Sequence, residues 1–212
     1  MHAKKKRVRV CRKVRPNRKA DLVTTVAGPS TAAVGSNVSY TVTVTNLGPG
    51  TALRAGVGVE IGWFPITVPG KFLPGPVSGE ISGGRRCSET EVGDREVNFA
   101  CPAGSLSLAR GASIQVTVTL QIGRIAGRLL YVDTEAYATS RDPQSRNNEA
   151  IANAQTTGCD PSYPGDLCIA PPPPDLNCDD LAPVTDIDVD WSVADPDPHH
   201  FDGDHDGIGC EP

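Results

Sequence analysis

The residues best suited to chemistry lie in the last eleven positions of the chain, where acidic side chains alternate with other residues. Ca²⁺ takes roughly six to eight oxygen ligands, so alternating carboxylates can converge on one ion while the chain wraps around it. Gly207 stands where such a loop turns sharply. An EF-hand would place a bidentate glutamate at its twelfth position, which this sequence lacks, so Glu211 is the carboxylate that remains to close the site. The pattern predicts a Ca²⁺ site with ligands from Asp202, Asp204, Asp206, Glu211 and the backbone carbonyl of Ile208.

Two further segments accompany these carboxylates: Asp197-Pro198-His199 with Phe201, and Asn177-Cys178-Asp179-Asp180. Together with the Asp-x-Asp-x-Asp-Gly-x-x-Cys-Glu pattern of residues 202–211, they resemble the excalibur domain, a short extracellular calcium-binding module of bacteria. The resemblance implies such a module over residues 176–212, with a disulfide between Cys178 and Cys210. The family usually has a helix between its two halves. Pro183 and the alternating aspartates of residues 186–190 depart from that pattern.

Charge divides the chain into three parts. Residues 1–19 contain ten Lys or Arg and no acidic residue, residues 20–157 contain ten basic and eleven acidic residues, and residues 158–212 contain fourteen acidic residues and no Lys or Arg. We therefore expect a disordered basic arm over residues 1–19, a globular domain over 20–157, a Cys/Pro-rich linker over 158–175 and the small module over 176–212. The module is too short to fold on a core of ordinary size and needs disulfides or metal.

The globular part has the period-two pattern of β-strands. Residues 38–45 and 114–122 alternate Val, Ile, Leu and Tyr with Ser, Thr and Gln, and Gly or Pro bounds both runs. We expect five further strands at residues 22–26, 57–61, 97–101, 129–138 and 149–154. Seven short strands in this length predict an all-β fold, an Ig-like β-sandwich. No segment shows a convincing helical period.

Several marks of this domain form a second resemblance. They are Ala20-Asp21-Leu22, the segment Val34-Gly35-Ser36-Asn37 through Asn46-Leu47-Gly48-Pro49, the cysteines at 87 and 101, Leu108 to Ser113, Asp142-Pro143 and Asn147-Asn148. They resemble the bacterial surface repeat called domain of unknown function eleven, over residues 20–157. The resemblance implies an Ig-like fold in a secreted or wall-associated protein, and it implies no reaction. It fades between Trp63 and Gly84, where we expect an enlarged loop.

The cysteines favour an extracellular setting. We expect one disulfide between Cys87 and Cys101, which flank a hairpin-length interval, and another between Cys159 and Cys168, which lie in a Pro/Gly/Asp loop. Closing a loop of about 15 residues stabilises a protein by roughly 3 kcal/mol in the chain-entropy model. A zinc site is the alternative, built from the cysteines at 159, 168 and 178 and the histidines at 199, 200 and 205, although their spacing is not that of structural zinc sites. Cys11, in the arm, is the one cysteine for which we expect no disulfide partner.

The basic arm has several interpretations. Lys4-Lys5-Lys6-Arg7 fits a nuclear import signal, a nucleic-acid contact or the start of a signal peptide, but no apolar core follows it before Ala20, and no transmembrane run occurs. We favour a mis-called or truncated start of a secreted or cell-surface protein. A genuine arm attracted to anionic wall polymer or to the acidic tail is the alternative.

Nothing in the sequence indicates catalysis. The histidines are His2 and three in the acidic tail, and no acid/base pair stands out among the glutamates. Trp63, Phe64 and Phe72 either cap the core or form an aromatic contact for a sugar or protein partner. We expect an extracellular bacterial calcium-binding protein with a structural or adhesive role, no enzymatic activity, no membrane span and no nucleic-acid partner. Its partners would be Ca²⁺ and cell-wall polymer or other surface proteins. The alternative is an accessory C-terminal region of a secreted enzyme such as a nuclease.

Overall fold

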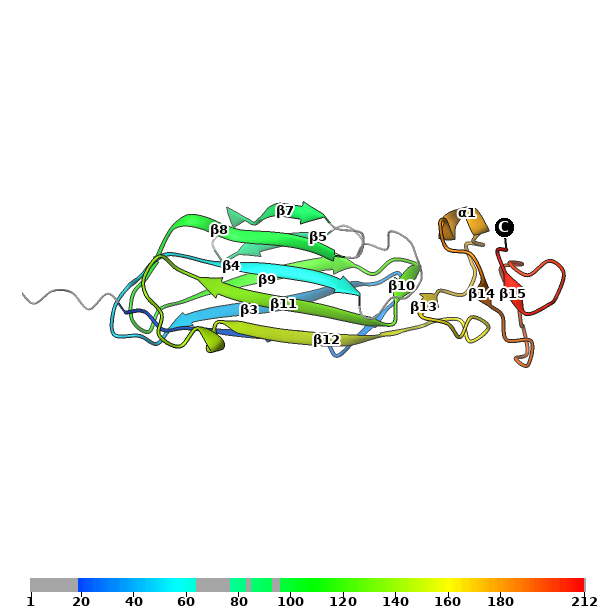
Figure 1. The fold of residues 1–212 in the computed structure, drawn as a ribbon, viewed down its shortest axis with the longest axis horizontal. Coiled ribbons are helices and arrows are strands. Elements are labelled where there is room, and N and C mark those ends of the chain that lie inside the picture. The colour runs from blue at the N-terminus through cyan, green and yellow to red at the C-terminus, as the bar shows by residue number, and fades with distance from the viewer. Residues whose placement is uncertain (1–18, 64–76, 83–84, 93–95, 212) are drawn as a thin grey trace, which may run out of the picture.

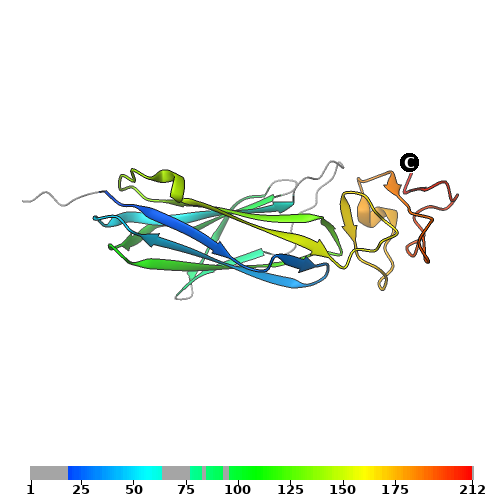
Figure 2. The ribbon, with the colours of Figure 1, turned by 90° about the horizontal axis from the view of Figure 1, so that it is seen from below.

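The protein is an elongated β-sandwich with a small module attached to one end (Figures 1 and 2). The computed structural model describes residues 19–63, 77–82, 85–92 and 96–211. The prediction of an all-β, Ig-like sandwich is confirmed. In the described part of the chain the helices are one α-turn, α1 (Cys178–Leu181), and one 3₁₀ turn (Ser145–Asn147). Phe64, Phe72 and Cys11 lie outside the described residues.

Two sheets form the layers of the sandwich. The first has the order β1-β3-β9-β5-β6 and consists of β1 (Leu22–Ala27), β3 (Asn37–Asn46), β9 (Ser113–Gln121), β5 (Val77–Ile81) and β6 (Arg85–Arg86). The second has the order β2-β12-β11-β4-β8-β7 and consists of β2 (Thr31–Ala33), β12 (Glu149–Thr157), β11 (Leu129–Tyr137), β4 (Ala52–Trp63), β8 (Glu96–Leu108) and β7 (Ser88–Val92). All seven strands expected from the sequence are present, and β4 and β8 are longer than their alternating segments indicated.

The alternating pattern explains which side chains form the core. In β3 the apolar residues Val38, Tyr40, Val42 and Val44 are buried, while the intervening polar residues face outward. β9 pairs with β3 in antiparallel register, so that Tyr40 lies opposite Val118 and both are buried. Trp63 is also buried, with 4% of its surface exposed, and therefore belongs to the core rather than to an exposed aromatic contact.

A buried amide closes one end of the sandwich. The Asn46 side chain donates to the carbonyls of Gly50 and Leu108, both at 2.8 Å, and accepts from the backbone N–H of Gly48 at 3.0 Å. A Cβ at Gly48 would lie 2.4 Å from the backbone nitrogen of Asp21, so only glycine fits there. These contacts give a physical reason for the Asn-Leu-Gly-Pro segment noted in the sequence.

The segment that we expected to be a linker packs against the sandwich. Within residues 158–175, β13 (Leu167–Ile169) pairs with β10 (Ile125–Gly127), and the Ala170 N–H donates to the Arg124 carbonyl at 2.8 Å. Leu167 and Ile169 are buried in the main core. Its cysteines and prolines gave this segment the composition of a linker, and a three-residue strand is too short to produce a periodic signal.

The C-terminal module combines α1 with a two-stranded sheet, β14 (Ile187–Asp188) and β15 (Ile208–Gly209). A few buried apolar side chains form its interior: Leu176, Leu181, Val184, Ile187, Val189 and Phe201. Between Cys178 and Cys210 the helical structure of the module is the single turn of α1. The next segment contains Pro183 and β14.

Three disulfides join the cysteine pairs that we expected. They are Cys87–Cys101, Cys159–Cys168 and Cys178–Cys210, with Cα–Cα distances of 4.4, 4.8 and 5.3 Å. The bond between Cys178 and Cys210 closes an interval of 32 residues, and the chain-entropy model assigns such a closure roughly 4 kcal/mol. A zinc site that uses Cys159, Cys168 and Cys178 is wrong, because disulfide sulfurs cannot act as thiolate ligands.

Thiol labelling tests these bonds. In protein made under oxidising conditions we expect a maleimide reagent to modify one cysteine per chain, Cys11, because the other six are oxidised. Mass spectrometry of the digested, labelled chain identifies the site. Labelling of three or more cysteines before reduction would contradict the bonding pattern.

Truncation tests the role of β13. A fragment of residues 1–171 keeps β13, whereas residues 1–157 lose Leu167 and Ile169 from the core. Each buried Leu or Ile contributes roughly 1.5–3 kcal/mol, so the shorter fragment should be less stable by on the order of 3 kcal/mol. Urea denaturation measures the difference. Equal stability of the two fragments would mean that β13 adds nothing to the sandwich.

Candidate metal site

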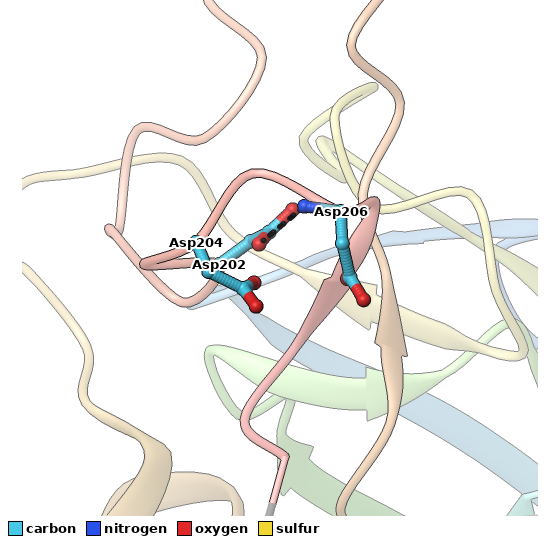
Figure 3. Close-up of side chains that lie close together, drawn as sticks. All are labelled: Asp202, Asp204 and Asp206. Atoms are coloured by element: carbon cyan, nitrogen blue, oxygen red, sulfur yellow. Dashed lines mark hydrogen bonds between the residues drawn. The ribbon is translucent and has the colours of Figure 1, made fainter.

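The three predicted aspartates lie on the loop between Phe201 and β15 (Figure 3). One carboxylate oxygen from each of Asp202, Asp204 and Asp206 lies within 4.8 Å of the others. Asp202 is buried, with 2% of its surface exposed, and the other two are exposed. The spacing of two residues therefore brings these carboxylates together, as the sequence predicted.

Asp202 organises the loop through hydrogen bonds to its carboxylate. Oδ1 accepts from the backbone N–H groups of His205 at 2.8 Å and Asp206 at 3.2 Å, the second of which is drawn in Figure 3. Oδ2 accepts from the Gly207 N–H and from Nε1–H of Trp191, both at 2.8 Å. Burial by itself raises the pKa of Asp202, but the hydrogen bonds from Trp191 and the backbone outweigh it and lower the pKa. The carboxylate is therefore ionised and fixed in orientation.

A second buried carboxylate supports the start of the loop. Asp197 accepts from the Phe201 N–H at 3.0 Å, from the Asp202 N–H at 2.9 Å and from the Tyr163 hydroxyl at 2.8 Å. Burial raises the pKa of Tyr163, and the hydrogen bond to Asp197 adds to this, so the phenol remains a donor. Asp197 therefore positions the residue that organises the metal loop.

Two glycines let the loop take its shape. Gly207 has φ of +99°, a conformation that side chains disfavour, in agreement with the sharp turn expected there. A Cβ at Gly209 would lie 2.7 Å from Cβ of Phe201. Gly209 is therefore required by close packing, which no spacing rule of a calcium loop indicates.

Glu211 lies close enough to the aspartates to be affected by their negative charge. Its pKa is raised, first by the negative charge of Asp206, then by burial, and further by Asp204 and Asp186. It follows Cys210, which the disulfide to Cys178 holds next to the loop. The convergent oxygens in the described part of the chain come from the three aspartates and not from Glu211, so Glu211 takes part as a nearby negative charge. Ile208 is the first residue of β15 and lies opposite Asp188.

The three carboxylates fit a hard cation. Calcium–oxygen distances are about 2.3–2.6 Å, so two ligands of one ion lie no more than about 5 Å apart, and a separation of 4.8 Å meets this limit. The donors are all oxygens, as Ca²⁺ and Mg²⁺ prefer. A carboxylate has about four lone-pair sites, and four N–H groups already use those of Asp202. An ion that binds Asp202 must share or displace one of these donors.

The sequence did not indicate the donor at Trp191. This residue is 40% exposed, its ring packs against His205 with a centroid distance of 4.6 Å, and its indole contacts Asp202. Eleven positions separate Trp191 from Asp202, and no local pattern joins them. An indole nitrogen is a donor only, so the presence of a Trp near an acidic motif is the one feature of the sequence that could have indicated this hydrogen bond.

Of the histidines in the tail, His199 is held in the interior by hydrogen bonds. His199 is buried, and its Nε2 lies 2.8 Å from the Ala170 carbonyl, which requires Nε2 to carry a proton. Its Nδ1 accepts from the Leu176 N–H at 3.1 Å and lies 3.1 Å from a carboxylate oxygen of Asp175. Both ring nitrogens of His199 are thus occupied, and this residue has a structural role between β13 and the module.

Comparisons with known proteins give likenesses of fold. No family model and no curated protein matches the sequence. The CARDB domain of the PF1109 protein from Pyrococcus furiosus, solved in complex with di-metal ions, aligns with a TM-score of 0.43 at 16% identity, over 65% of this chain and 89% of that chain. A cohesin module from a family 33 glycoside hydrolase of Clostridium perfringens aligns with a TM-score of 0.40 at 11% identity, over 65% of this chain and 98% of that chain. The β-glucosidase from Listeria innocua aligns with a TM-score of 0.37 at 10% identity, over 65% of this chain and 16% of its own.

Trp191 provides an optical test of the site. We expect its fluorescence to change when Ca²⁺ is added, because the ion competes with its N–H for Asp202. In Trp191→Phe the change should disappear while calorimetry still detects binding, and Trp63→Phe is the control that keeps the signal. A calcium-dependent emission that persists in Trp191→Phe would refute the coupling between Trp191 and Asp202.

Proposed function

We propose that this chain is an extracellular calcium-binding protein with a structural or adhesive role and no catalytic activity of its own. The observation that carries the proposal is the convergence of Asp202, Asp204 and Asp206 on a loop that is already folded around the Asp202 carboxylate. In this proposal the module belongs to the excalibur type, and the sandwich to the surface repeats that resemble it in sequence.

The choice of calcium follows from the ligand set. All donors are oxygens, which disfavours zinc, and two of the three carboxylates are exposed, which leaves the shell open to water and to the backbone. Mg²⁺ requires nearly ideal octahedral geometry at about 2.0–2.1 Å and releases its waters reluctantly. A short, exposed loop meets the demands of Ca²⁺ more easily. In this proposal the Glu211 carboxylate, which lies outside the convergent group, moves toward the ion and completes the shell together with the Ile208 carbonyl.

The extracellular setting is supported by the disulfides. The chain has three disulfides. Such bonds persist in oxidising compartments and are rare in the cytosol. No helix in the described part of the chain has the length and hydrophobicity to cross a membrane. A β-sandwich that carries a small module at one end suits a role in spacing or presentation at a cell surface, and wall polymers or other surface proteins are the partners we propose.

The structural role of calcium follows from charge. Residues 158–212 contain fourteen carboxylates and no Lys or Arg, so mutual repulsion opposes the compact state of the module. A divalent ion among Asp202, Asp204 and Asp206 offsets part of this repulsion where the charges are closest. Calcium would therefore stabilise the module, with less effect on the nearly neutral sandwich.

Calorimetric titration tests this function. We expect one Ca²⁺ per chain with a Kd on the order of 10⁻⁴ to 10⁻³ M and much weaker binding of Mg²⁺. At free Ca²⁺ about 100 times the Kd, the module should gain about 2.7 kcal/mol in unfolding free energy. Asp204→Ala and Asp206→Ala should each weaken binding by at least about tenfold, which at the same free Ca²⁺ lowers this gain to about 1.4 kcal/mol or less.

Asp179→Ala is the matched control, because Asp179 is an exposed aspartate of the same module that lies in α1 and outside the loop. It should bind Ca²⁺ as the parent does. If Asp204→Ala or Asp206→Ala binds Ca²⁺ as tightly as the parent, the ligand assignment is wrong. If the parent binds no Ca²⁺ at millimolar concentration, the proposed function fails.

A further inference from the structure

The outer face of the six-stranded sheet carries a second group of carboxylates, remote in sequence from the tail. Glu60 on β4, Glu96 on β8, and Asp133 and Glu135 on β11 line one hollow together with Glu149 at the start of β12. Its volume is about 690 Å³. Glu60, Glu96 and Asp133 are half-buried, and Glu135 and Glu149 are exposed. These residues are scattered through the sequence, and only the sheet brings them together.

Glycines on the central strand leave this hollow open. In β4, Val57, Val59 and Ile61 point into the core, so Gly58, Glu60 and Gly62 occupy the outward positions. A Cβ at Gly58 would have no neighbour closer than the Glu135 carbonyl at 3.9 Å. Space for a side chain therefore exists at Gly58 and is unfilled. The floor of the hollow is backbone, and carboxylates stand beside it.

The register of the strands places like charges opposite each other. Asp133 faces Glu60 across β11 and β4, and Glu135 faces Glu149 across β11 and β12. Like charges at directly opposed positions destabilise a sheet. The Tyr131 hydroxyl donates to Glu60 at 2.8 Å and lies 3.3 Å from a carboxylate oxygen of Glu96, so one proton serves two acids. Half-burial strengthens the repulsion, because solvent screens such charges less.

The arrangement suits an extended cation better than a metal ion. Among the described residues, the carboxylates whose oxygens converge within metal-binding distance are those of Asp202, Asp204 and Asp206. The acids of the sheet are instead spread along the strands. From the level of Gly58, opposite Glu135, to that of Gly62, opposite Glu96, the strand rises about 13 Å. Such a row of charges matches a basic peptide that lies along the sheet.

We infer that this acidic groove, formed by Glu60, Glu96, Asp133, Glu135 and Glu149 over Gly58, binds the basic N-terminal arm of the same chain. Residues 1–19 contain ten Lys or Arg and no acidic residue, so the two charges are complementary. The inference does not depend on calcium binding by the tail.

The arm starts at the correct end of the sheet. The backbone of Lys19 forms an isolated parallel β-bridge with that of Arg141, and the Ala20 N–H donates to the Arg141 carbonyl at 3.0 Å. Arg141 lies in the connection from β11 to β12, the two strands that carry Asp133, Glu135 and Glu149. An extended chain of 18 residues spans up to about 60 Å, several times the length of the groove. A tether of this kind gives a local concentration on the order of millimolar, which favours the chain's own arm over a separate partner.

Cys11 makes the inference testable without an engineered probe. The other six cysteines are in disulfides, so a nitroxide reagent will modify Cys11 in the full-length chain. In NMR spectra of this protein we expect selective loss of amide intensity along the groove, at Gly58, Glu60 and Asp133, relative to the same sample after the nitroxide is reduced. The loss should disappear at about 1 M salt, where the Debye length is about 3 Å.

A groove variant that removes three of the five charges, Glu60→Gln, Asp133→Asn and Glu135→Gln, should largely remove the loss, because glutamine at 60 still accepts from Tyr131 but carries no charge. The matched control, Asp179→Asn, Asp188→Asn and Asp195→Asn, removes three exposed carboxylates of the tail and should leave the loss unchanged. If the groove variant does not fold, the salt titration of the parent chain remains decisive.

Other occupants give other outcomes. Loss of intensity at the Asp202–Asp206 loop instead of the groove would mean that the arm binds the acidic tail. Loss that appears when nitroxide-labelled ¹⁴N chains are mixed with unlabelled ¹⁵N chains would mean that the arm of a second copy binds. Either result, or the absence of any selective loss at low salt, overturns the inference.

Discussion

The carboxylate of Asp197 is the contact on which the arrangement of the C-terminal part of the protein, residues 158–211, depends. It accepts hydrogen bonds from Tyr163, in the segment that packs on the sandwich, and from the backbone of Phe201 and Asp202, where the metal loop begins. A buried carboxyl group needs such donors, because burial of a polar group without hydrogen bonds is costly. The requirement works in both directions. Asp197 is stable only if Tyr163 and the loop are in place, and the loop is oriented only if Asp197 is present, so the module and the segment after β12 form one hydrogen-bonded unit.

The strands of the sandwich could be predicted because their information is local. In β3 and β9 each residue carries its own indication of whether it faces the core. The pairing of these two strands is not local, since it joins Thr45 with Ser113, 68 positions apart, and only the fold shows it. β10 and β13 could not be predicted in this way, since three residues cannot show a period and their pairing joins Ile125 with Ile169 across more than forty positions. The same limit applies to the outer face of the second sheet. The sequence shows Glu60 and Asp133 as scattered acids, and only the register of β11 on β4 makes them neighbours.

The candidate metal site likewise has a part that the sequence could predict and a part that it could not. The spacing of Asp202, Asp204 and Asp206 was sufficient to predict that their carboxylates converge, because a loop of five residues has few ways to keep them apart. The contacts that hold Asp202 in place come from Trp191 and, through Asp197, from Tyr163. These residues precede Asp202 by eleven and thirty-nine positions, so no motif of a short loop contains them. The acidic loop is therefore visible in the sequence as a set of spaced carboxylates, whereas the residues that support it are visible only in the fold.

The two groups of carboxylates differ in what can neutralise them. In the tail the oxygens approach within 4.8 Å on one short loop with positive φ at His205 and Gly207, a geometry that a single ion can complete. On the sheet the strands fix the spacing, and among the described residues the carboxylates of the groove form no group within metal-binding distance. A basic peptide suits these fixed positions better than a single ion does, because its own side chains can adapt to the spacing of the charges. In our proposals the acidic groove and the loop of residues 202–206 therefore take different cations for a geometric reason. The segregation of charge along the chain, basic at one end and acidic at the other, does not require the two ends to bind each other.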